Sequence, residues 1–137
     1  MTAIPTAKKS LDRQNGDVYS FKIAASTTIP EGALVSINAG GYAVNATDTT
    51  AEVVVGVADE TQTAVSAGDK SIKVRRNGVF TFVFGGTATI ADVNTLVYAV
   101  DNQTVDLAGV TTNDIVVGRI VEFVSATKVR VDIRDRA

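Results

Sequence analysis

The chain has 137 residues, and its 48 valine, isoleucine and threonine residues far outnumber its 4 leucines. β-Branched side chains lose rotamer freedom in helices and pack well on pleated sheets, so this composition predicts an all-β protein of single-domain length. The formal charge of −2 argues against direct nucleic-acid binding, and the absence of cysteine and histidine excludes disulfides, thiolate chemistry and histidine-based catalysis or metal binding.

Residues 1–16 are polar and show no apolar periodicity, and Asn15-Gly16 is a turn signal. We expect an extended N-terminal arm there, and interface candidates within it are Ile4, Pro5, Lys8 and Lys9. No apolar stretch has the length of a signal peptide core or of a membrane span. We therefore expect no membrane association and a location in a cytoplasm.

Residues 17–137 read as a single β domain built from short apolar segments separated by turns. Asn77-Gly78 predicts a type I′ hairpin, because that turn requires positive φ at both central residues. A single helical turn is expected within 89–94. The result should be a compact small barrel or sandwich of about eight to ten short strands, expected at 18–23, 33–38, 42–44, 53–58, 71–76, 79–84, 96–100, 104–107, 115–124 and 127–133.

The middle of the chain repeats itself. Leu34-Val35 matches Leu96-Val97, and Val55-Gly56 matches Val117-Gly118, both at an offset of 62 residues. The repeat predicts an internal duplication with halves at about 28–58 and 89–120. We expect two half-sheets that close on one another about a pseudo-twofold axis, with Val55 and Val117 in matching buried places.

The sequence offers few side chains that could carry out catalysis. Paired carboxylates are the remaining option, but adjacent residues on a strand point to opposite faces, so solvated strand ends are expected instead. We expect no enzymatic activity, no cofactor and no metal. The charged groups considered are Asp59 with Glu60, Asp132 with Asp135, the doublet Arg75-Arg76 as a solvated hairpin tip, and Lys128, Arg130, Asp132 and Arg134 as the wet face of the last strand.

Phe80, Phe82 and Phe84 occupy alternate positions on one face of the strand predicted at 79–84. Aromatic side chains bury large apolar areas, so this pattern predicts a core face. The opposite face of the same strand is also fairly apolar. A hydrophobic subunit contact through these phenylalanines is therefore the alternative interpretation.

Several short motifs follow in order along the chain: Gly56-Val57-Ala58, then Ala67-Gly68-Asp69, then Gly78-Val79-Phe80. Their order resembles the core pattern of small tailed-phage capsid cement (head decoration) proteins, and Ile29-Pro30-Glu31-Gly32-Ala33-Leu34-Val35 is similar to the family's opening. The resemblance covers the layout of residues 17–135.

This resemblance implies a structural virion protein without catalytic residues or cofactors. It would be assembled in a bacterial host cytoplasm, would bind the outside of a bacteriophage head and would stabilise contacts between capsomers of the major capsid protein. Self-association is also implied, with a trimer favoured by analogy with other decoration proteins.

Two further classes stay open at this point. One is a β-rich module of another phage assembly, such as a tail or baseplate, that binds carbohydrate through Tyr42, Tyr98 and Asn102. The other is a hydrolase on a small β-barrel, which would show two carboxylates within about 5–10 Å of each other in a deep pocket.

Overall fold

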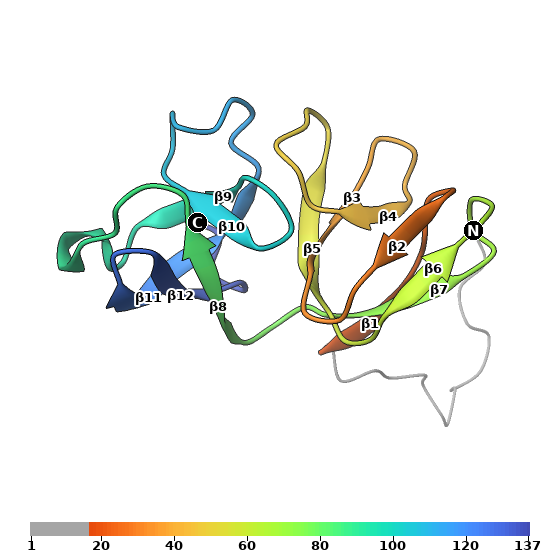
Figure 1. The fold of residues 1–137 in the computed structure, drawn as a ribbon, viewed down its shortest axis with the longest axis horizontal. Helices are drawn as coiled ribbons and strands as arrows, with labels where there is room; N and C mark the ends of the chain where they lie inside the picture. Colours follow the sequence, from red (N-terminus) through yellow and green to blue (C-terminus); the bar gives the residue numbers. More distant parts are fainter. Residues whose placement is uncertain (1–16) are drawn as a thin grey trace, which may run out of the picture.

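The computed structural model describes residues 17–137, and the predicted arm of residues 1–16 lies outside this range. The described part is all β except for one short 3-10 helix, η1 (Ile90–Asp92), which confirms the predicted fold class and the helical turn (Figure 1). Residues 17–137 form twelve strands, two more than the ten expected. The strands are β1 (Val18–Lys22), β2 (Thr27–Ile29), β3 (Leu34–Ile37), β4 (Ala43–Asn45), β5 (Val53–Ala58), β6 (Gln62–Ala64), β7 (Ser71–Arg75), β8 (Val79–Phe84), β9 (Leu96–Ala99), β10 (Thr104–Asp106), β11 (Val116–Ser125) and β12 (Lys128–Asp132).

The strands form two groups that lie side by side along the long axis of the molecule (Figure 1). The first group is a five-stranded sheet in the order β1-β7-β5-β3-β4, and a parallel bridge between Ile23 and Ala43 joins its two ends. The second group is a closed barrel in the order β10-β8-β12-β11-β9, which β10 closes by parallel pairing with β8. Strands β2 and β6 pair separately.

The two groups share one strand arrangement and register, which confirms the predicted duplication, and we call them the first and the second copy. Val35 lies opposite Gly56 on β5, and Val97 lies opposite Gly118 on β11. In each copy the register then shifts by one residue. The shift leaves Val55 in the first copy and Val117 in the second as the extra, buried residue of a β-bulge.

The duplicated unit is longer than the sequence indicated. Val18 pairs with Arg75 as Val79 pairs with Asp132, so β1 corresponds to β8 and β7 to β12. The first copy therefore spans residues 18–75 and the second spans residues 79–132. The sequence offset between equivalent residues is 62 at Gly56 and Gly118 but 57 at Arg75 and Asp132. The offset is smaller there because the connection between β5 and β7, which carries β6, is longer than the two-residue turn between β11 and β12.

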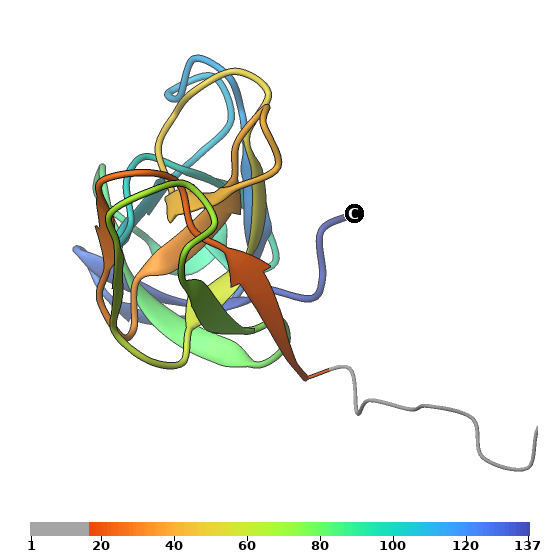
Figure 2. The same cartoon turned by 90° about the vertical axis from the view of Figure 1, so that its right-hand side faces the viewer.

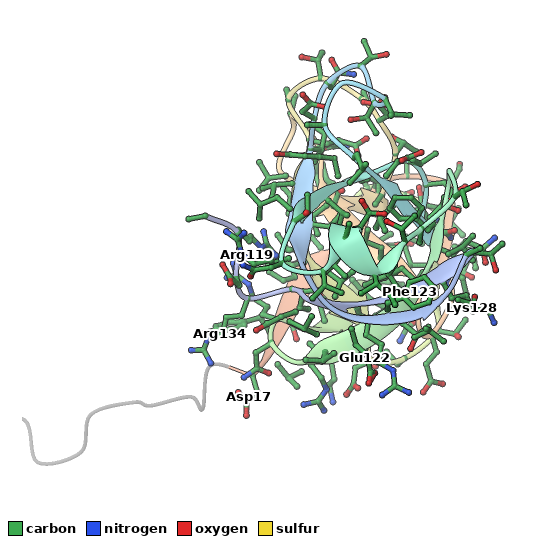
Figure 3. The ribbon with its side chains drawn as sticks, turned by 90° about the vertical axis from the view of Figure 1, so that its left-hand side faces the viewer. Asp17, Arg119, Glu122, Phe123, Lys128 and Arg134 are labelled. Atoms are coloured by element: carbon green, nitrogen blue, oxygen red, sulfur yellow. The ribbon has the colours of Figure 1, made fainter. Side chains whose placement is uncertain are left out.

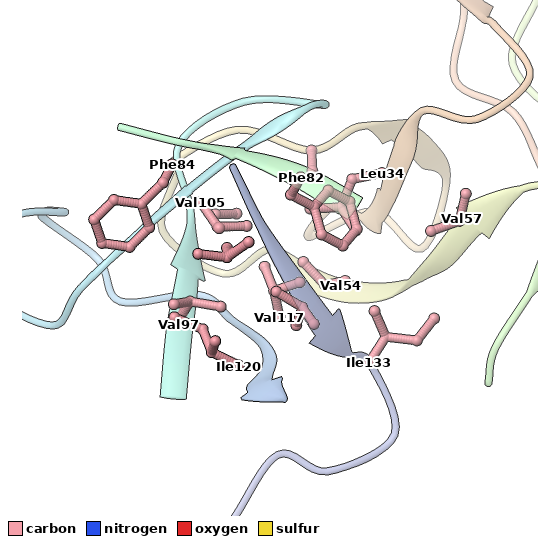
Figure 4. Close-up of a cluster of buried hydrophobic side chains, with 14 of the residues drawn as sticks. Leu34, Val54, Val57, Phe82, Phe84, Val97, Val105, Val117, Ile120 and Ile133 are labelled. Atoms are coloured by element: carbon pink, nitrogen blue, oxygen red, sulfur yellow. The ribbon is translucent and has the colours of Figure 1, made fainter. Parts of the chain in front are cut away.

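Each copy encloses its own apolar side chains, so the expectation of two half-sheets closing on one another is wrong. Parallel pairing of β10 with β8 closes the second copy, and the single bridge from Ile23 to Ala43 links the ends of the first sheet. One buried cluster fills the first copy while another fills the second. The second cluster also includes Leu34, Val54 and Val57 of the first copy, and Figure 4 shows Leu34 next to Phe82.

The contact between the copies does not follow a twofold axis. A twofold contact uses equivalent residues from both partners. Leu34, Val54 and Val57 are buried in the shared cluster, whereas their counterparts in the second copy are only half-buried and lie outside it. The expectation of a pseudo-twofold relation is therefore wrong. The counterparts are Leu96, Val116 and Arg119.

The hairpin predicted at Asn77-Gly78 does not form. A strand has two edges, and β1 and β5 occupy both edges of β7, while β12 and β10 occupy both edges of β8. Residues 76–78 are instead the link between the copies, and the chain on either side of it pairs with distant segments. The Arg76 N–H donates to the carbonyl of Asp17 over 2.8 Å, and Gly78 accepts from the Ile133 N–H over 3.2 Å.

Candidate functional site

The phenylalanines of β8 belong to the interior of the second copy. Phe82 and Phe84 are each only 4% exposed, and half-buried Phe80 packs against the same cluster. The core prediction is confirmed for Phe82 and Phe84, and their burial removes both from the set of interface candidates. The other candidates, Ile4, Pro5, Lys8 and Lys9, lie outside the described residues.

The predicted outer charged face of β12 is confirmed for Lys128 and Arg130, whereas Asp132 is half-buried and Arg134 lies beyond the end of the strand. Lys128 and Arg130 are exposed, while Val129 and Val131 between them are fully buried. Arg130 pairs with Glu122 on β11 at 3.0 Å. Figure 3 shows Glu122 and Lys128 on this outer surface.

Two of the four carboxylates considered for catalysis pair with arginines. Asp59 lies 3.6 Å from Arg75, and Asp135 lies 3.1 Å from Arg119. Asp132 accepts a hydrogen bond from the backbone N–H of Arg134 over 3.0 Å. Within residues 17–137 no group of three or more acidic, cysteine or histidine side chains is placed to hold a metal ion.

Asn102, one of the residues considered for sugar binding, forms hydrogen bonds between the two copies. The Asn102 side chain donates to Asn45 Oδ1 over 3.1 Å, and the Asn102 backbone carbonyl accepts from the Leu34 N–H over 2.8 Å. Asn102 therefore joins the second copy to the first. Tyr42 precedes β4 in the first copy and Tyr98 lies on β9 in the second, and neither lines the hollows described below.

A second polar contact joins the loops that follow β4 and β10, which project on the same side of the molecule (Figures 1 and 2). The Asp48 carboxylate accepts from the backbone N–H groups of Thr112 over 2.7 Å and Asn113 over 2.8 Å. The Asn113 side chain donates back to the Asp48 carbonyl over 3.0 Å. These backbone donors favour the ionised carboxylate and hold the pKa of Asp48 below its ordinary value of 3.8.

The lowered pKa of Asp48 predicts a pH-dependent contribution to stability. The ionised carboxylate stabilises the folded state above its ordinary pKa, and this stabilisation is lost as the pH falls through the lowered pKa of the folded state. Asp48→Asn should therefore reduce the free energy of unfolding most at pH 7 and progressively less towards pH 2, as measured by urea unfolding. A matched control is Glu31→Gln at another exposed carboxylate of the first copy. A difference between Asp48→Asn and wild type that is independent of pH would contradict the assignment.

A basic hollow lies where the two copies meet. It has a volume of about 310 Å³ and is lined by Tyr19, Arg76, Asn77, Ile133, Arg134 and Arg136. These residues come from β1, the link between the copies and the segment after β12. We name this hollow the arginine pocket. Arg134 and Asp17 lie at this side of the molecule in Figure 3.

Three contacts hold the arginine pocket in shape. The Arg76 guanidinium lies over the Tyr19 ring, 5.4 Å from its centroid. Arg136 donates from Nε to the Ile133 carbonyl over 2.9 Å and from Nη1 to the Val54 carbonyl of the first copy. Burial, and then the nearby charge of Arg76, lower the pKa of Arg136.

Sequence reasoning missed the arginine pocket. It treated Arg76 as part of a hairpin tip and Arg134 as part of a wet strand face, and it did not consider Arg136. The available signal was the alternation Arg134-Asp135-Arg136 after the last strand, but only the contact between copies brings this segment to Arg76.

Two other hollows are less charged. One of about 360 Å³ is lined by Thr81, Phe82, Val83, Gln103 and Lys128 together with Gly32, and a smaller one of about 200 Å³ lies beside it near residues 30–33. Each has only one charged side chain in its lining, Lys128 in the first and Glu31 in the second. Neither brings together groups for catalysis.

In the part of the chain that the structure describes, no helix has the length and apolar character needed to cross a membrane. No family model, curated protein or solved structure matches this chain. The site is therefore interpreted from its own geometry and from the motifs in the sequence.

Proposed function

We propose that this protein is a capsid decoration protein that binds the outside of a bacteriophage head and stabilises contacts between capsomers of the major capsid protein. The observation that carries the proposal is the position of the motifs that resemble that family. Gly56-Val57-Ala58 ends β5, Ala67-Gly68-Asp69 precedes β7, and Gly78-Val79-Phe80 leads into β8. The resemblance thus falls on strands of the repeated unit and on the turns beside them.

The proposal also specifies how the protein acts. A decoration protein that binds the assembled shell better than free subunits stabilises the shell by mass action. The shared apolar cluster joins the two copies, so that contacts made by each copy would hold a fixed spacing. Many copies acting on one particle, as single chains or as homo-oligomers, need only weak individual contacts.

The test uses undecorated heads of the phage that encodes the protein. Adding the protein should raise the temperature at which the heads rupture, measured by the release of packaged DNA, and binding should saturate at a fixed ratio to the major capsid protein. Heads of an unrelated phage serve as the control. Folded protein that leaves the heads unbound and equally fragile would refute the proposal, and binding to purified tails alone would favour the tail or baseplate alternative.

A further inference from the structure

The arginines of the described part of the chain divide into two sets of three. Arg75, Arg119 and Arg130 each lie within 4.0 Å of a carboxylate. The other three line the arginine pocket, and none of them has a carboxylate partner within that distance among residues 17–137. The arginines of residues 17–137 that lack a carboxylate partner are thus concentrated in one hollow, whereas the lysines of this range lie outside it.

Bringing these three arginines together is electrostatically unfavourable. Arg136 is partly buried, and its two hydrogen-bond acceptors are carbonyl groups, which carry no full negative charge. Burial and the charge of Arg76 both disfavour its charged form, as the lowered pKa shows. Nearby acids have other hydrogen-bond partners: Asp135 pairs with Arg119, Asp132 accepts from the backbone N–H of Arg134, and Asp17 accepts from the side chain of Asn77, which itself lines the pocket. A bound anion would offset the repulsion.

The geometry of the arginine pocket also favours the binding of an anion, because the guanidinium groups of Arg76 and Arg136 are held in place. The carbonyls of Val54 and Ile133 hold the Arg136 side chain, and the Tyr19 ring lies against Arg76. Guanidinium groups present planar donors that match carboxylate and phosphate oxygens, and fixing them beforehand reduces the entropy lost on binding. The volume of about 310 Å³ suits a small group.

Two other occupants fit less well. Residues 1–16 carry Lys8, Lys9 and Arg13 against one acid, Asp12, so the chain's own arm has the same sign of charge as the pocket. A nucleic acid would need a basic groove with several aromatic platforms, whereas the pocket is a confined hollow with one tyrosine.

We propose that the arginine pocket binds an oxyanion, either the carboxylate of an acidic partner side chain or a phosphate group, through Arg76, Arg134 and Arg136. The site is independent of the proposed function and is testable on the isolated full-length chain. Binding of an acidic side chain there would give the protein a polar docking point at the junction of its two copies.

The test is a titration of the ¹⁵N-labelled protein with succinate and, separately, with inorganic phosphate, against sodium chloride at equal ionic strength. Saturable shifts should appear in the arginine side-chain and backbone signals of the pocket and be absent with chloride. Saturation by both probes assigns a general oxyanion site. Saturation by succinate alone identifies a carboxylate as the ligand, and saturation by phosphate alone identifies a phosphate group.

Variants distinguish binding in the arginine pocket from a general effect of positive charge. Arg76→Gln with Arg134→Gln alters two exposed side chains and should weaken binding about tenfold or more, because each charged hydrogen bond contributes substantially. The matched control, Lys73→Gln with Arg130→Gln, removes the same charge outside the pocket and should leave binding unchanged. The single variant Arg134→Gln gives a second measurement if the double variant loses its native spectrum. Equal weakening by both double variants, or shifts no larger than those with chloride, would overturn the proposal.

Discussion

Replacing Gly56 or Gly118 by alanine should destabilise the protein severely and by similar amounts. A Cβ atom at Gly56 would lie 2.1 Å from the Arg75 carbonyl oxygen, and one at Gly118 would lie 2.2 Å from the Asp132 carbonyl oxygen. The atoms in the way are backbone atoms of a neighbouring strand in the same sheet, so they cannot move aside as a flexible side chain would. We expect each variant to lose about 3 kcal/mol or more of unfolding free energy.

Thermal unfolding followed by circular dichroism measures this effect, and a loss of that size lowers the melting temperature by roughly 10 °C or more. Gly40→Ala is the matched control, because a Cβ atom there would make only ordinary contacts, the nearest at 3.4 Å from the Asn38 side chain. A tolerated alanine at one of the two glycines but not at the other would show that the copies do not share this close approach.

The paired glycines also show how far the sequence reveals the fold. Their common offset was visible because each copy needs a glycine where β5 or β11 approaches its neighbouring strand closely. The match between β1 and β8 was not visible, because the same sheet position is filled by different residue types, such as Lys22 and Val83. Only the register reveals that correspondence.

Local signals failed where long-range pairing decided the structure. Asn77-Gly78 has the composition of a tight hairpin, but neighbouring strands already occupied both edges of β7 and β8. Strands β2 and β6 were missed because each is short and mostly polar, and their pairing brings together Thr28 and Thr63 from distant parts of the chain. Such pairing is a property of the tertiary structure.

The candidate site was even less accessible from the sequence. Arg76 and Arg136 are 60 residues apart, and no local pattern places them together. They meet because the link after β7 and the segment after β12 both lie at the junction of the copies. A junction between two repeats depends on how the repeats pack, and the repeat pattern itself carries little information about that packing.

The phenylalanines of β8 give the second large expected effect. Phe82→Ala should cost about 3–5 kcal/mol of unfolding free energy, because it opens a cavity in the cluster that Leu34 of the first copy shares. Phe21, which occupies the corresponding position on β1, is half-buried, so Phe21→Ala should cost less than half as much. Urea unfolding at equilibrium measures both values.

The same variant tests whether the two copies unfold together. Because residues of the first copy pack in the interior of the second, damage at Phe82 should destabilise both copies. Phe82→Ala should therefore give one transition, at a lower urea concentration, with coincident tyrosine fluorescence and circular dichroism. Two separated transitions would show that the first copy survives alone, and the shared cluster would then be a docking contact between two independent units. A single transition would mean that one stiff body carries the proposed contacts with the phage head.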